Sequence, residues 1–491
     1  MKKFTIILSS ILLILCFVLF AACDAGGYHG EYWHGSQYVD DSNYQYESVI
    51  EQSFVSAAEQ PDSYFSLDRN TASYSLMRRQ IEENRKLAAD SVRIEEFVNY
   101  FNYNYARPTG DNALALGGSL FDCPWNSKHA LLSISVAAEE LTIENKPQNN
   151  LVFLIDTSGS MYGADRLGLI QQAFTMLLEN LDENDIISVV TYAGDSRVAL
   201  DGEIGSHRVK IAGVIEDLEA QGSTNGAGGL QNAYKIAEKH FIEGGNNRVI
   251  LATDGDFNVG VSTKTGLQKL ISEKRSSGIY LSVLGVGMTN TNDTTMKTLA
   301  ENGNGNYAYL DSILEAKKAL VEELCGTLVT VAKDAKIGVT FNPDVVEKYR
   351  LLGYDTKLLT EEQFEDEATD AGEIGAGHTV TAVYEVELKD GATGNVAKAE
   401  VRYKNPKSNE SKSVLMTYTT ADYTESPSED CVFIGCVLEY GLLLRQSKYK
   451  GDASFEAVLS RLESLSEYLA GDEFKAQFAE IVQKAAKLYR M

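Results

Sequence analysis

Three short segments carry oxygen-bearing side chains whose types and spacing suit the binding of a hard divalent cation. Residues 156–160 read Asp-Thr-Ser-Gly-Ser, Thr224 lies in a Gly-rich loop at 222–226, and Asp254 directly follows an apolar run. A hard cation prefers an octahedral shell of oxygen ligands, and neighbouring glycines let the backbone approach closely. We therefore predict one metal site formed by two carboxylates and three hydroxyls: Asp156, Ser158, Ser160, Thr224 and Asp254.

The elements that must position these side chains alternate between strands and helices. Short apolar runs that are typical of strands buried on both faces occur at 151–155, 186–192, 249–252 and 280–286. Helical patterns fall at 167–181, 208–218, 230–241, 263–275 and 313–324. This alternation predicts a doubly wound α/β (Rossmann-like) domain over 148–326. Ligands bind beyond the carboxyl ends of the strands in such folds, where the three segments lie.

The flanks of this domain have a different character. Residues 61–147 combine two helical patterns within 71–101 with strand patterns at 113–120 and 129–136. Strand patterns return in 327–425, and 426–491 reads as three helices separated at Gly451 and Gly471. Neither set of strands is large enough to form a stable sandwich alone. We therefore predict that the α/β domain is inserted into one β-sandwich built from both flanks.

The N-terminus indicates export from the cytoplasm. Lys2 and Lys3 precede an apolar stretch, and small residues come directly before Cys23. This resembles a bacterial lipoprotein signal, with 1–22 as the signal peptide and Cys23 as the lipidated residue; an uncleaved signal anchor is the alternative. Residues 23–60 are predicted to be a flexible tether rich in Tyr, Gly and acid. The later cysteines permit disulfides without requiring them: Cys123, Cys325, Cys431 and Cys436.

Composition and motifs exclude several function classes. The 70 Asp and Glu residues outnumber 44 Lys and Arg residues, and the net charge of -26 repels phosphate backbones, so nucleic acid is not expected as a partner. The sequence contains no HExxH and no GxSxG motif, and no histidine lies near Ser158 or Ser160 in the sequence. We therefore do not expect an enzyme.

The three oxygen-bearing segments resemble the metal-ion-dependent adhesion site of von Willebrand factor A domains. That site is written DxSxS, then Thr, then Asp, and this chain matches it at all five positions in the same order. The resemblance implies Mg2+ as the ion, with Mn2+ as the alternative, and serines that ligate it directly. It also implies an open coordination position for an acidic side chain of a protein partner. The alternative interpretation is that these residues are ordinary turn and cap residues.

The flanks are similar to those of the YfbK-type bacterial lipoproteins. The similarity lies in 66–74 and 92–101 before the α/β domain and in 341–343, 349–354 and 370–380 after it. It implies a protein anchored to the membrane by lipid alone, outside the cytoplasm, in the bacterial envelope. The function expected is a surface-tethered, metal-dependent protein-binding module. The alternative is a structural or assembly subunit of an envelope complex, in which the metal only stabilises the domain.

Overall fold

The computed structural model describes residues 50–67, 69–140, 147–224, 226–255, 264–287, 293–322 and 329–490. The predicted signal peptide, the predicted lipidation residue Cys23 and most of the predicted tether lie outside these residues. Among the described residues, no helix is both long enough and apolar enough to cross a membrane.

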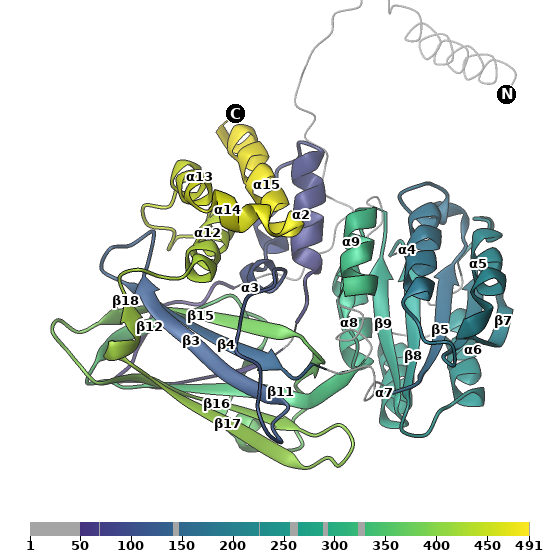
Figure 1. The fold of residues 1–491 in the computed structure, drawn as a ribbon, viewed down its shortest axis with the longest axis horizontal. Coiled ribbons are helices and arrows are strands. Elements are labelled where there is room, and N and C mark those ends of the chain that lie inside the picture. The colour runs from purple at the N-terminus through teal and green to yellow at the C-terminus, as the bar shows by residue number, and fades with distance from the viewer. Residues whose placement is uncertain are drawn as a thin grey trace, which may run out of the picture. The chain divides into compact units, whose positions relative to one another are not determined.

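The α/β domain is built on a sheet of strand order β10-β9-β8-β5-β6-β7, six strands within the described residues (Figure 1). Five of them run parallel, and β7 pairs antiparallel with β6 at one edge. Their bounds are β5 Asn149–Asp156, β6 Ile186–Tyr192, β7 Ser196–Ile204, β8 Asn246–Thr253, β9 Ile279–Gly285 and β10 Tyr307–Tyr309. The doubly wound α/β fold predicted from the sequence is confirmed.

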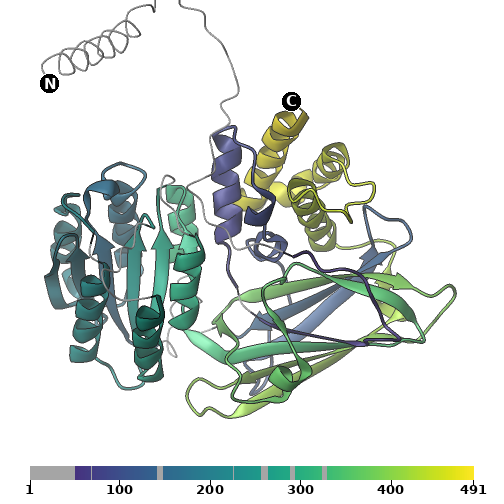
Figure 2. The same cartoon turned by 180° about the vertical axis from the view of Figure 1, so that it is seen from behind.

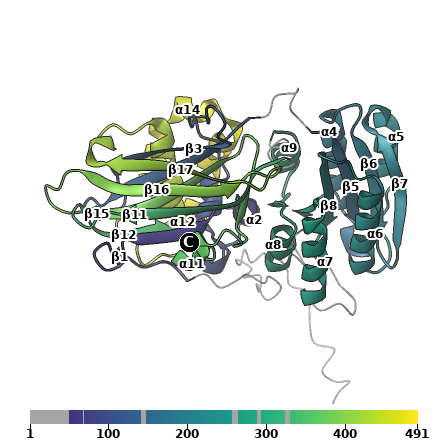
Figure 3. The ribbon, with the colours of Figure 1, turned by 90° about the horizontal axis from the view of Figure 1, so that it is seen from below.

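Helices cover both faces of this sheet because alternate residues of each buried strand point to opposite sides. Leu151 and Phe153 of β5 pack with helices α4, α5 and α9, whereas Val152 and Leu154 pack with α6, α7 and α8 (Figure 3). The helices are α4 Leu167–Glu179, α5 Arg208–Glu216, α6 Gly226–Lys239, α7 Lys264–Ser276, α8 Asp293–Asn302 and α9 Ile313–Lys317. A π-helical turn, Lys318–Glu322, follows α9.

Two further sheets pack against each other around a shared apolar core (Figure 2). One has the order β1-β12-β15-β4-β3-β18, from β1 Val55–Ser56, β3 Leu114–Asp122, β4 Ala130–Ala138, β12 Val346–Leu352, β15 Thr379–Leu388 and β18 Tyr423–Thr424. The other has the order β13-β2-β11-β16-β17, with β14 beside β11, from β2 Asp62–Ser66, β11 Thr330–Phe341, β13 Leu358–Leu359, β14 Gly372–Gly375, β16 Asn395–Lys404 and β17 Ser411–Thr419.

Strand pairing in this sandwich crosses the α/β domain. β4 precedes that domain and β15 follows it, yet they pair over eight residues from Thr379↔Ala137 to Val386↔Ala130. β2 and β11 pair across the same insertion in the second sheet. The predicted insertion of the α/β domain into one sandwich is therefore confirmed.

The N-terminal and C-terminal helices form a separate core that covers the outer face of β4 and β15. It contains α2 Ala72–Glu82, α3 Ile94–Val98, α12 Glu429–Leu444, α13 Phe455–Ser464, α14 Ser466–Ala470 and α15 Glu473–Arg490. The described tail thus has four helices where the sequence predicted three, because the chain breaks again at Leu465. Gly451 and Gly471 separate helices as predicted. Cys123, Cys431 and Cys436 are buried free thiols, and Cys325 lies outside the described residues.

One part of the predicted tether is held on the sandwich. Val55 and Ser56 form β1 and pair with Tyr349 and Lys348 of β12. Ala57 is buried, and its N–H donates to the Glu347 carbonyl at 3.1 Å. The prediction of a flexible tether over 23–60 is therefore wrong for the stretch around β1, because its backbone and side chains are bound to the body.

Candidate metal centre

The first predicted ligand segment begins at the carboxyl end of β5, the central strand beside β6 and β8. Asp156 is the last residue of β5 and is fully buried. Its Oδ1 accepts a hydrogen bond from the Ser158 backbone N–H at 2.9 Å, and its Oδ2 accepts one from the Thr253 hydroxyl at 3.2 Å. The hydroxyl oxygens of Ser158 and Ser160 lie 3.0 Å apart. Three of the five predicted ligands are thus in direct contact.

The second segment is fastened to the first by backbone hydrogen bonds. The Gly159 N–H donates to the Gly222 carbonyl at 3.0 Å, and the Gln221 N–H donates to the Thr157 carbonyl at 2.7 Å. Gly222 has a φ of +89°, a conformation that residues with a Cβ rarely adopt. Thr224 lies two residues beyond this point and is half-buried, just before α6. The hydrogen bonds of this loop therefore hold Thr224 near the first segment.

The third segment follows β8. Asp254 is 3% exposed, and the preceding residue, Thr253, donates the hydrogen bond to Asp156 described above. The Gly255 N–H donates to the same Thr253 hydroxyl at 3.3 Å. β8 pairs in parallel with β5, so Asp254 and Asp156 lie at the carboxyl ends of neighbouring strands. All three segments meet at one end of the sheet.

Burial dominates the electrostatics of the central carboxylate. The pKa of Asp156 rises to about 6, chiefly because burial disfavours its charged form, while hydrogen bonds from Ser158 oppose the rise. Burial also raises the pKa of the neighbouring Tyr192 phenol, and the charge of Asp156 adds to that rise. Two buried carboxylates beside neutral hydroxyls offer negative charge and oxygen ligands to a cation.

The ligand atoms available at these five positions indicate which cations could bind there. Asp156, Ser158, Ser160, Thr224 and Asp254 offer only oxygen atoms, which suit Mg2+ or Mn2+ better than zinc. Within the described ranges, no group of three or more His, Cys, Asp and Glu side chains is arranged to hold a metal. A metal in this domain would therefore depend on the hydroxyl groups of the three segments.

Two arginines near the first segment were not predicted from the sequence. Arg166 donates to the Ser160 carbonyl at 2.6 Å, and Arg79 of α2 forms a 3.0 Å ion pair with Asp165. Arg166 follows the motif by only six residues, so its proximity could have been noticed. Arg79 comes from the flank, and no sequence pattern connects it with this loop.

The α/β domain can be assigned to a class. The family model described as "von Willebrand factor type A domain" matches residues 150–323. A second model, described as "von Willebrand factor", matches residues 40–133. The α/β unit is thus a von Willebrand factor A (VWA) domain, as the resemblance of its ligand motif predicted.

The sequence on both sides of the VWA domain identifies the family to which the whole chain belongs. The model described as "Uncharacterized protein YfbK, C-terminal" matches residues 326–488. Protein YfbK of Escherichia coli (strain K12) is 37% identical over 470 residues, which cover 90% of this chain and 81% of that protein. The chain belongs to the YfbK family.

More distant relatives share the VWA domain. Human inter-alpha-trypsin inhibitor heavy chain H3 is 28% identical over 191 residues, covering 37% of this chain and 21% of that protein. A solved von Willebrand factor type A structure from Catenulispora acidiphila aligns with a TM-score of 0.43 at 14% identity, covering 76% of this chain and 91% of that one. VWA domains are typically protein-interaction modules, mostly without enzymatic activity, and often bind a divalent metal.

Proposed function

We propose that this protein is a metal-dependent protein-binding module, tethered to the bacterial cell envelope by a lipid on Cys23. The metal is Mg2+, with Mn2+ as the alternative, and the partner is a protein that offers an acidic side chain. The observation that carries this proposal is the contact between Asp156, Ser158 and Ser160 beside the buried Asp254.

The residues of the site would contribute two kinds of ligand to the ion. Ser158, Ser160 and Thr224 offer neutral hydroxyl oxygens, and Asp156 and Asp254 offer negative charge. A bound ion would supply a positively charged coordination position for a carboxylate of the partner. With neutral hydroxyls as direct ligands and few carboxylates coordinated directly, a bound ion would keep residual positive charge. An incoming Asp or Glu would then complete both the coordination shell and the charge balance.

The proposed metal site lies where a protein partner could reach it. The loops lie beyond the carboxyl ends of the strands, where doubly wound folds bind their ligands. Ser160 and Thr224 are half-buried, and Tyr162, directly after the first segment, is 81% exposed. An exposed aromatic ring beside a metal position offers apolar contact area to a bound protein.

The proposal is tested by metal titration and by capture of partners from the native envelope. Mg2+ binding by the purified chain is measured by calorimetry, for the wild type and for Asp156→Ala. We expect the substitution to abolish metal binding and, in parallel, the capture of envelope proteins in Mg2+. EDTA should release the same proteins from the wild type.

Glu183→Ala is the matched control, because Glu183 is an exposed acid that precedes β6. It lies at the amino ends of the strands, opposite the end that carries the predicted ligands. The substitution should leave metal binding and capture unchanged. Capture that persists both in EDTA and with Asp156→Ala would contradict the metal bridge. It would support the alternative of an assembly subunit whose contacts lie outside the metal site.

A further inference from the structure

The segment that enters the sandwich from the N-terminal side, residues 51–56, is held like a bound peptide; we call it the strap. Its last two residues are β1, which extends one sheet by pairing antiparallel with the edge of β12. Addition of an extended segment to a sheet edge is a common mode of peptide recognition, in which backbone pairing gives affinity and side-chain pockets give specificity. The strap has both kinds of contact.

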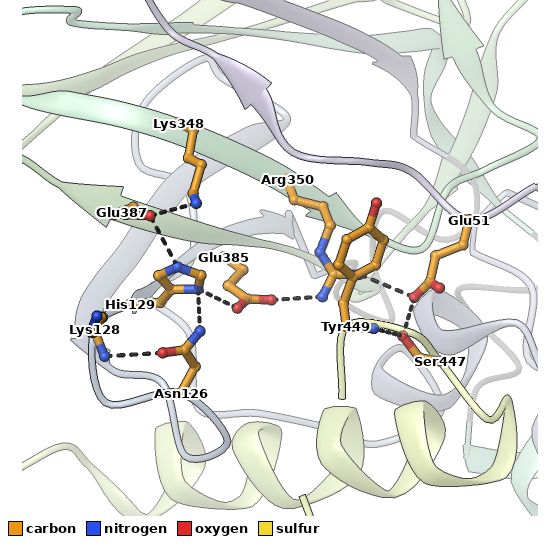
Figure 4. Close-up of polar contacts among 10 residues, drawn as sticks. All are labelled: Glu51, Asn126, Lys128, His129, Lys348, Arg350, Glu385, Glu387, Ser447 and Tyr449. Carbon is orange, nitrogen blue, oxygen red and sulfur yellow. Dashed lines mark hydrogen bonds and ion pairs between the residues drawn. The ribbon is translucent and has the colours of Figure 1, made fainter. Parts of the chain in front are cut away.

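The receptor side is a buried polar cluster on the outer face of β12, β15 and β4 (Figure 4). Arg350 and Glu385 each have a side-chain exposure of 1%, and Arg350 Nη2 lies 2.6 Å from Glu385 Oε2. Glu385 Oε1 lies 2.5 Å from His129 Nδ1, and Glu387 Oε2 lies 3.3 Å from His129 Nε2. These contacts fix the Arg350 guanidinium from within the body, without help from the strap.

Glu51 is the acidic anchor of the strap. Its Oε1 accepts from Arg350 Nη1 at 3.1 Å and from the Ser447 hydroxyl at 2.5 Å (Figure 4). The central carbon of the Arg350 guanidinium lies 4.4 Å from the centroid of the Tyr449 ring. Because a buried carboxylate and an aromatic ring hold this guanidinium, its Nη1 is preorganised to bind a second carboxylate.

Phe54 is the aromatic anchor of the strap. Its ring centroid lies 5.0 Å from that of His129 and 5.7 Å, edge-on, from that of Tyr449. The cationic groups of Lys348 and Arg350 lie 5.1 Å and 5.4 Å from the same centroid. A phenyl ring between two aromatic rings and two cations combines apolar burial with cation–π attraction.

The strap is more exposed than the residues that bind it, and it makes fewer contacts with the body. The strap residues are partly buried except for the exposed Ser53, and Ile50 just before the strap is 80% exposed. The ladder of the strap comprises two residue pairs. So short a strand has little stability of its own. Arg350, Glu385 and Ser447 are buried and are held mainly by the body. The body thus holds the receptor residues through contacts of its own. The strap is held by its two side-chain anchors and by a few backbone hydrogen bonds, among them that of the Gln52 N–H to Asp355 Oδ1 at 3.2 Å.

We propose that this cluster is a binding site for an extended acidic–aromatic peptide, Glu-x-x-Phe, that is occupied here by the chain's own strap. The same segment of a second copy would fill it when the strap of the first is withdrawn. Arg350 and Ser447 would hold the carboxylate, the rings of His129 and Tyr449 would hold the phenyl group, and the edge of β12 would pair with the following residues.

The test is binding of a fluorescent peptide of residues 50–58 to the purified full chain, measured by anisotropy. The double substitution Glu51→Ala and Phe54→Ala vacates the site, and circular dichroism checks that the fold is retained. We expect this variant to bind the peptide at least tenfold more tightly than the wild type, whose own strap competes. If the double variant does not fold, Phe54→Ala alone is used with the same expectation.

Matched peptides and receptor variants identify the anchors. Peptides in which the residue corresponding to Glu51 is Gln, or that corresponding to Phe54 is Ala, should bind at least tenfold more weakly. On the vacated chain, Tyr449→Ala should lower the affinity severalfold. Phe241→Ala, which removes an aromatic ring that is 41% exposed in the VWA domain, should not. Absence of binding to the folded vacated variant would overturn the proposal, as would equal affinity of the three peptides.

Discussion

At the scale of single residues, Asp156 governs how the proposed metal centre responds to pH when no metal is bound. It is fully buried, and its pKa of about 6 lies above the ordinary Asp value of 3.8, so the folded chain holds a proton more tightly than the unfolded chain does. A divalent ion would take the place of that proton. The same carboxylate therefore links the stability of the fold to pH and to metal.

The sign of the pH effect follows from this raised pKa. The stabilisation is fully present below the unfolded pKa and is lost as the pH rises through about 6. In EDTA, the unfolding free energy of the wild type relative to Asp156→Asn should fall by roughly 1 kcal/mol between pH 5 and pH 7.5, because Asn does not titrate. Urea unfolding at both pH values measures this difference.

Saturating Mg2+ provides the control for this prediction. Metal that binds only the folded state stabilises the wild type according to its concentration and dissociation constant. It should add stability to the wild type at pH 7.5 and leave Asp156→Asn unchanged. A difference between wild type and variant that does not vary with pH in EDTA would show that Asp156 is ionised throughout this range.

At the scale of elements, the position of α6 against the sheet depends on one glycine. A Cβ on Gly229 would lie 2.7 to 2.9 Å from three atoms of the buried Tyr192 at the end of β6. Gly229→Ala should therefore destabilise the fold by about 1–3 kcal/mol, because overpacking outweighs the better helix propensity of Ala. Thermal unfolding measures the loss.

Gly213→Ala in α5 is the matched control, since a Cβ at Gly213 meets nothing within 4 Å. That change should be neutral or stabilise by up to about 1 kcal/mol, as expected for Gly to Ala in a helix. If the two substitutions had equal effects, close packing of α6 on Tyr192 would not be what requires glycine at this position.

The same scale shows what sequence patterns can predict. The long buried strands β5, β6, β8 and β9 were predicted because they form apolar runs between helical patterns. β7 was missed, since an edge strand of polar and half-exposed residues such as Arg197 and Glu203 lacks that signature. The break between α13 and α14 at Leu465 was missed as well, because neither glycine nor proline marks it.

Residues of the metal centre could be predicted for a related reason. Four of the five predicted ligands lie at or just beyond the carboxyl ends of the neighbouring strands β5 and β8. Thr224 lies in the loop between α5 and α6, which backbone hydrogen bonds hold beside the first segment. The strap site could not be predicted in this way. Glu51, His129 and Arg350 are separated by long stretches of sequence, and each is a single polar residue on or beside a sandwich strand.

At the scale of the whole molecule, a buried arginine joins the VWA domain to the helices of both flanks. Arg78 of α2 has a side-chain exposure of 1%, and its Nη2 lies 2.5 Å from Asp311 Oδ1 and 2.7 Å from Glu315 Oε2. Its Nη1 donates to the Tyr100 hydroxyl at 2.7 Å and to Gln477 Oε1 at 3.0 Å. Segments from before, within and after the VWA domain thus meet at one side chain.

Removing this arginine should destabilise the junction strongly. Arg78→Met would leave Asp311 and Glu315 buried without their cation, a change that costs about 3–5 kcal/mol in buried ion pairs. The reference substitution is Lys317→Met, which removes a half-exposed ion pair with Glu473 and should cost less than about 1 kcal/mol. Urea unfolding of both variants gives the comparison.

The double variant Arg78→Met with Glu315→Gln separates loss of charge pairing from loss of packing. If the unpaired charge of Glu315 causes much of the destabilisation, the second substitution should restore part of the lost free energy, even though Glu315→Gln alone is destabilising. Additive effects of the two substitutions would show that they do not interact energetically. In that case the lost contacts of Arg78 with Asp311, Tyr100 and Gln477, rather than the unpaired charge of Glu315, would account for the destabilisation.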